Sequence, residues 1–171
     1  AYATKAFGGQ VRDLGLIFLV LFPVPYVDAS AAAAFRSKHR RAVVGAAGML
    51  VETALAALAL HVWLLVQPGG LRALAFNVMV IGGVSTVIIN GNPLLRFDGY
   101  FILADLLEIP NLAARSTRYW GHLADRHLFR TEGVRGFAAT AGERAWFLAY
   151  APAAFAYRIA VLLAIALFLA S

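Results

Sequence analysis

The sequence contains no cysteine and few charged residues for its length. The absence of cysteine from the 171 residues excludes a disulfide framework, a thiolate metal ligand and a cysteine nucleophile. Charged residues make up only 14% of the chain and hydrophobic residues 61%, a balance that excludes an ordinary soluble domain. The composition therefore predicts a polytopic membrane protein or a segment of one.

Several catalytic motifs are also absent. The chain has no G-x-S-x-G motif, no phosphate-binding loop and no dinucleotide fingerprint. Its four histidines do not include the H-E-x-x-H pair of a zinc peptidase, so they cannot build a metal site among themselves. If a metal is bound, its other ligands lie outside this chain.

Three apolar runs are long enough to cross a bilayer as helices, which takes about 20 residues each. The runs 42–66 and 71–89 are joined by a turn of glycine and proline at 67–70, which predicts a membrane hairpin. The third run covers 145–170. The chain starts at Ala1 without a signal peptide, and we expect a segment that continues beyond both ends in a longer protein.

Two other segments complete the predicted fold. The run 14–27 is short for a span and is interrupted by Pro23 and Pro25, which predicts an extended or re-entrant segment. Residues 111–130 form an amphipathic pattern that is typical of a helix at the lipid surface. Its basic face is predicted to contain Arg115, Arg118, His122 and Arg126. We therefore expect one all-α membrane-embedded domain over 1–171, with about three spanning helices.

Positive charge is concentrated beside the apolar runs. Lysine and arginine outnumber the acids by 15 to 9, for a net charge of +6. One basic cluster covers 36–41, from Arg36 to Arg41, and the second covers 115–144, from Arg115 to Arg144. Because basic loops tend to stay in the cytoplasm, we expect both clusters to face the cytoplasm and do not expect a nucleic-acid partner.

Residues 90–99, NGNPLLRFDG, follow the second span directly and contain its most informative polar residue, Asp98. A carboxylate at the broken end of a membrane helix is costly to bury unless something binds it. From the residues alone, Asp98 either N-caps a helix over 99–108 or binds a ligand, and the two roles are compatible.

A second acid, Glu52, lies within the first span. It either forms a hydrogen bond to another helix or faces a wet cavity, or it takes a catalytic role. His61 is half a helical turn out of phase with Glu52 and is predicted not to share its site. Asn90 and Asn92 are favoured turn residues, because asparagine tolerates left-handed backbone and bonds to its own backbone.

The motif N-x-x-P-x-x-x-F-D-G at 90–99 resembles the N-x-x-P-x-x-x-L-D-G motif of the site-2 protease family of intramembrane zinc metallopeptidases. Together with DLLEIPNL at 105–112, it is similar to the bacterial branch that is often found with membrane-fusion adaptors of secretion systems. The resemblance extends to three further stretches, residues 1–9, 22–30 and 47–52. In the last of these, Glu52 occupies the position at which the family's helix motif has asparagine. The resemblance implies that Asp98 is the third zinc ligand.

The resemblance also implies what lies outside the chain. The family's H-E-x-x-H would stand just before Ala1 and supply two histidine ligands and a catalytic glutamate. Zn²⁺ with three protein ligands keeps one position for water and lowers the pKa of that water to about 7, while the glutamate acts as general base. Asn90 and Asn92 would orient the substrate or polarise its carbonyl, and Glu52 is a further candidate. This segment alone is expected to be inactive.

The expected partners are a peptide or membrane-protein substrate, the lipid bilayer of a bacterial inner membrane and a membrane-fusion adaptor. Two alternatives stay open. One is a non-catalytic membrane subunit of an export system that kept the fold without the metal. The other is a transporter, in which the broken helix around Pro93 would bind an ion or substrate. The sequence contains no second broken helix to pair with the one around Pro93, which argues against the transporter.

Overall fold

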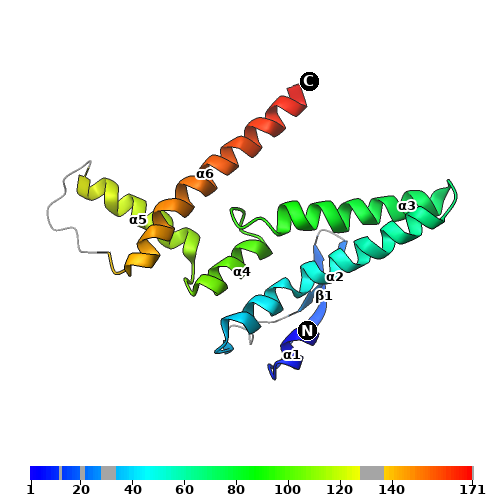
Figure 1. Ribbon diagram of the computed structural model, residues 1–171, viewed down its shortest axis with the longest axis horizontal. Coiled ribbons are helices and arrows are strands. Elements are labelled where there is room, and N and C mark those ends of the chain that lie inside the picture. The colour runs from blue at the N-terminus through cyan, green and yellow to red at the C-terminus, as the bar shows by residue number, and fades with distance from the viewer. Residues whose placement is uncertain (12, 20–21, 28–33, 128–136, 171) are drawn as a thin grey trace. The chain divides into compact units, whose positions relative to one another are not determined.

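The computed structural model describes residues 1–11, 13–19, 22–27, 34–127 and 137–170 (Figure 1). Helices make up nearly all of the regular structure in these ranges, which confirms the predicted all-α class. The chain divides into two compact units, Ala1–Leu106 and Leu107–Ser171. The single domain over 1–171 stays a prediction, and the two units are described in turn.

Three helical segments are long and apolar enough to cross a membrane, as predicted. They are α2 (Lys38–Leu65), the continuous pair α3 (Gly70–Met79) and η2 (Val80–Asn90), and α6 (Ala141–Ala170). Large apolar side chains are exposed along all three, including Leu65 at 84% and Phe168 at 79%. Helices that are apolar all round are typical of membrane spans, so these are compatible with a membrane protein.

The first unit is built on a helical hairpin in which α3 and η2 return along α2 (Figure 1). Small residues allow the helices to approach closely, as at the interfaces of membrane helices. A Cβ atom added at Gly82 would stand 3.2 Å from the carbonyl oxygen of Glu52 and 3.6 Å from Cβ of Ala56. At the tip, the guanidinium of Arg72 lies 4.7 Å from the centre of the Trp63 ring.

The N-terminal part of this unit contains a short helix and a β-hairpin. Helix α1 (Tyr2–Ala6) ends before Gly8, whose φ of 82° favours glycine. The predicted extended segment is observed as strands β1 (Leu14–Leu19) and β2 (Phe22–Val27), which pair antiparallel. Prolines are tolerated in β2 because a two-stranded sheet leaves each strand one free edge. Residues 28–30 of the matched stretch 22–30 lie outside the described residues.

Helix α4 (Asp98–Leu107) follows the broken end of η2 and contacts the beginning of α2. Arg41 Nε donates to Asp105 Oδ1 at 3.1 Å, and a Cβ atom at Gly45 would stand 3.4 Å from Ile102. Asp98 and α4 therefore lie at the end of the hairpin that contains the 36–41 cluster, away from its tip.

The second unit pairs α5 (Leu112–His127) with α6. The predicted amphipathic helix over 111–130 is observed over Leu112–His127, and its last three residues lie outside the described residues. Its basic face is not uniformly exposed. Arg115 turns toward α6, where Nη1 lies 2.6 Å from Glu143 Oε1 and the guanidinium lies 5.0 Å from the centre of the Phe147 ring. Arg118 and Arg126 remain exposed.

Helix α6 begins at Ala141, four residues before the predicted start at 145. A capping box explains the earlier start. The backbone N–H of Thr140 donates to Glu143 Oε2 at 2.9 Å, and the backbone N–H of Glu143 donates to Thr140 Oγ1 at 3.3 Å. These reciprocal bonds satisfy two donors at the end of the helix.

Candidate functional site

The candidate site lies where the second span ends. All of η2 is a π-helix, wider than an α-helix, and its last turn ends with the backbone N–H of Gly91 donating at 2.8 Å to the carbonyl of Thr86, five residues back. Such π-type turns are rare in proteins, and many of the known examples lie at functional sites. The regular helix stops at Asn90, and Asn92 follows in a turn with its N–H 3.3 Å from the carbonyl of Ile89.

The side chain of Asn92 stabilises this turn. Its Oδ1 accepts a hydrogen bond from the backbone N–H of Leu94 at 2.9 Å. This local bond is the turn chemistry predicted for asparagine. It occupies the amide oxygen and leaves the amide N–H₂ group as the part of Asn92 that could meet a substrate.

Asp98 is the first residue of α4 and not the residue that caps it. The carbonyl of Phe97 accepts the first helical bonds, from Tyr100 N–H at 3.0 Å and Phe101 N–H at 3.4 Å. The interpretation of Asp98 as the N-cap of a helix over 99–108 is therefore wrong, because the helix begins one residue earlier. Its half-buried carboxylate forms no hydrogen bond or ion pair with any residue that the structure describes.

Gly99 explains how Asp98 comes close to the end of η2. A Cβ atom at this buried position would collide with the carbonyl group of Gly91 and would stand 3.0 Å from the carbonyl oxygen of Asn90. Only glycine allows the first turn of α4 to pack this tightly on the broken helix end. The packing therefore explains why glycine follows Asp98 in the motif, since any side chain at this position would collide.

Glu52 is the second acid of the site. Its Oε2 accepts a hydrogen bond from Thr86 Oγ1 on η2, and Thr86 is only 2% exposed. Partial burial raises the pKa of Asp98 above its ordinary value, and the negative charge of Glu52 raises that pKa further. The structure thus brings together the two acids that the sequence singled out, and no described cation pairs with either.

The side chain of His61 contacts the backbone of its own helix, α2. His61 Nδ1 lies 3.3 Å from the carbonyl oxygen of Ala57, one turn back on its own helix. That His61 and Glu52 do not share a site stays a prediction.

The described residues could supply part of the coordination shell of a zinc ion. Asp98 has an uncommitted carboxylate, which is a suitable oxygen ligand for zinc. Within the described ranges, however, no three His, Cys, Asp or Glu side chains gather closely enough to hold an ion. Asp98 could therefore serve as one ligand, and the other ligands would have to come from outside the described residues.

Thr86 is the residue of this site that sequence reasoning missed. A lone glutamate in one span requires a hydrogen-bonding partner on a neighbouring helix. Few polar side chains of the second span are available to supply it, among them Ser85 and Thr86. That shortage of polar residues was the signal that could have identified Thr86.

Comparisons of the chain with models of known protein families, with curated proteins and with solved structures found no match. The assignment of function therefore depends on the motif at 90–99 and on the geometry around Asp98.

Proposed function

We propose that the full-length protein is an intramembrane zinc metallopeptidase of the site-2 protease family and that this chain supplies its aspartate ligand. The observation that supports the proposal is the environment of the Asp98 carboxylate. Its half-buried carboxylate has no described cationic partner and lies close enough to Glu52 for the two charges to interact. Such an arrangement is costly unless a cation compensates it, and Zn²⁺ is a cation of suitable charge.

In this proposal Asp98 binds the metal together with two histidines supplied upstream of Ala1. The bound metal would supply Lewis-acid activation of water for attack on a peptide carbonyl. The packing of Gly99 against Asn90 and Gly91 holds the Asp98 carboxylate at the broken helix end. A ligand fixed by rigid packing needs little reorganisation when the metal binds.

Three other residues are proposed to act on the peptide. Asn92 keeps its amide N–H₂ group available to donate to a substrate carbonyl, since its oxygen is held by Leu94 N–H. Glu52 has one oxygen bonded to Thr86 and can accept a hydrogen bond from a peptide N–H with the other. Asn90, at the end of η2, would assist in orienting the same segment.

Two steps test the proposal. The coding region immediately upstream of Ala1 is sequenced for H-E-x-x-H, and the purified full-length protein is assayed in detergent for cleavage of a membrane-spanning peptide, with and without a zinc chelator. We expect the motif and chelator-sensitive cleavage. A full-length protein without H-E-x-x-H would contradict the peptidase and favour a non-catalytic subunit of an export system.

We also propose a bacterial inner-membrane location with both basic clusters in the cytoplasm. Lys38 and Arg41 lie at one end of the α2 hairpin, and Arg72 is the single basic residue at the tip, which is the other end. A reporter fused near Gly69 should read as outside. One fused near Gly133, which lies outside the described residues, should read as inside, and the opposite pattern would refute this topology.

A further inference from the structure

A cavity of about 420 Å³ opens at the tip of the hairpin that α2 and α3 form. Residues from the end of α2, the connecting turn and the beginning of α3 line it, among them Trp63, Gly69, Arg72, Phe76 and Asn77. Its volume is within the range of roughly 300 to 1,000 Å³ that is usual for ligand sites. Because both apolar spans end here, the cavity lies where they would meet the bilayer surface.

Arg72 is the single charged residue of this cavity. Its guanidinium lies 4.7 Å from the centre of the Trp63 ring, and that ring centre lies 6.4 Å from the centre of the Phe76 ring. Arg72 is half-buried, and none of the carboxylates that the structure describes forms an ion pair with it. The sequence has no acidic residue between Glu52 and Asp98. Arg72 is therefore a positioned cation whose charge no neighbour along the chain compensates.

Asn77 adds a second polar group on the inner side of the cavity. Its side chain is exposed within the apolar span, and its amide forms no hydrogen bond with any residue in the described ranges. An amide without a partner is costly in hydrocarbon. Asn77 follows Arg72 by five residues, so it lies about 7.5 Å deeper along the helix. The cavity thus presents a cation near the surface and an amide donor below it.

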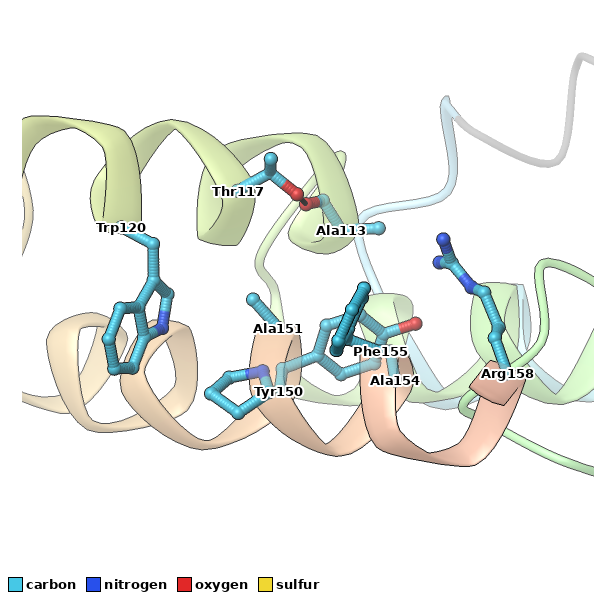
Figure 2. Close-up of a pocket in the computed structure, with 9 residues that line it drawn as sticks. Ala113, Thr117, Trp120, Tyr150, Ala151, Ala154, Phe155 and Arg158 are labelled. Atoms are coloured by element: carbon cyan, nitrogen blue, oxygen red, sulfur yellow. Dashed lines mark hydrogen bonds between the residues drawn. The ribbon is translucent and has the colours of Figure 1, made fainter. Parts of the chain in front are cut away.

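The depth of this cavity distinguishes it from the cavity between α5 and α6 in the second unit. Figure 2 shows Arg158 at one end of that second cavity, beside Phe155. Arg158 lies near the middle of the spanning helix α6, where a lipid headgroup would have to leave the bilayer surface. Trp63 and Arg72 lie near the ends of their spans. Of the two cavities, the one at the hairpin tip matches the depth of a headgroup.

We infer that the cavity at the hairpin tip binds a phospholipid of net negative charge. The lipid phosphate accepts hydrogen bonds from the Arg72 guanidinium, whose planar donors match phosphate oxygens. A glycerol ester carbonyl, which lies deeper than the phosphate in every diacyl phospholipid, accepts from the Asn77 amide. The acyl chains continue toward the bilayer interior past Phe76. This site does not involve Asp98 and does not rest on the peptidase.

Trp63 provides a direct probe of the cavity that it lines. The full 171-residue chain is prepared with Trp120→Phe and Trp146→Phe, which leaves Trp63 as the single tryptophan. It is reconstituted in phosphatidylcholine vesicles that contain increasing fractions of brominated phosphatidylglycerol or brominated phosphatidylcholine, and quenching of Trp63 fluorescence is measured. We expect phosphatidylglycerol to bind about fivefold more tightly, the size expected for one arginine and an anionic lipid. Equal binding of the two lipids would overturn the inference.

A pair of variants distinguishes a built site from general charge at the bilayer surface. Arg72→Gln should remove the preference for phosphatidylglycerol. The double variant Leu71→Arg with Arg72→Gln is the matched control, because it keeps one arginine at the tip but moves it to an exposed position that does not line the cavity. We expect this double variant to lack the preference as well. A double variant with the full preference would show that surface charge alone attracts the lipid, and would overturn the inference.

The contact at Asn77 is tested with a phosphatidylglycerol whose chains are ether-linked, because it lacks the ester carbonyls. Its competition against brominated phosphatidylglycerol at Trp63 should be about two- to tenfold weaker than that of the ester lipid, as for the loss of one hydrogen bond. In Asn77→Leu the ester and ether lipids should compete equally. A variant that still discriminates between them to the full extent would overturn the role of Asn77.

Discussion

Asp98 and Asp105 lie on the same helix, about two turns apart and on nearly the same face, yet their surroundings differ. Asp105 is neutralised by Arg41 at 3.1 Å, and the pair holds α4 against α2. Asp98 has no such cation among the described residues and instead lies near a second acid, Glu52. The contrast distinguishes a carboxylate that serves the packing of helices from one that is left open for an external cation.

The strongest way to break this contrast is to remove the open carboxylate. Asp98→Ala in the full-length protein should lower zinc-dependent proteolysis by more than about 100-fold, because loss of a residue that only orients a metal ligand already costs about 10- to 100-fold. Membrane insertion should be unchanged. Cleavage of a membrane peptide is the measurement, with the exposed Asp125→Ala on α5 as the matched control. Full activity in the Asp98 variant would remove the ligand assignment.

The hydrogen bond that holds Glu52 offers a second test, because it joins η2 to α2. Thr86→Val conserves the shape of this buried side chain but deprives Glu52 of its donor, which should cost about 1–3 kcal/mol of stability. Thr53→Val is the matched control, since Thr53 is exposed and bonds only to the Met49 carbonyl of its own helix at 2.7 Å. Unfolding in mixed micelles measures both variants. Equal losses would show that the bond between the helices adds nothing.

The smallest effect is expected at the neutralised carboxylate. A double-mutant cycle with Arg41→Gln and Asp105→Asn should give a coupling energy of about 0.5–1 kcal/mol, because the Asp105 side chain is 38% exposed and solvent screens the pair. Neither variant should change the zinc content. A coupling of several kcal/mol, or loss of zinc, would mean that the two aspartates of α4 are not functionally distinct.

The spanning helices were predictable because apolar length is a local property of the sequence. The predicted runs 42–66 and 71–89 correspond to Lys38–Leu65 and Gly70–Asn90 within a few residues. The helix break before Asp98 was predictable for the same reason, since Gly91 and Pro93 stand two residues apart and both disfavour a helix. Pro152 alone does not end α6, which continues past it.

Pairings between helices were not predictable from periodicity. The helical pattern of 111–130 grouped Arg115 with exposed cations, but packing against α6 turned it toward Glu143 and Phe147. Thr86 was missed because its role depends on the register between η2 and α2, which close contact at Gly82 determines. In both cases tertiary packing selected the partner.

The role of Asp98 as a zinc ligand is tested by the zinc content of the purified full-length protein, measured by elemental analysis for the parent, Asp98→Ala and Asp105→Asn. We expect about one zinc per chain in the parent and in Asp105→Asn, as for a single-metal catalytic site, and a strong reduction in Asp98→Ala. Equal zinc content in the parent and Asp98→Ala, or no zinc in a freshly purified active parent, would contradict it.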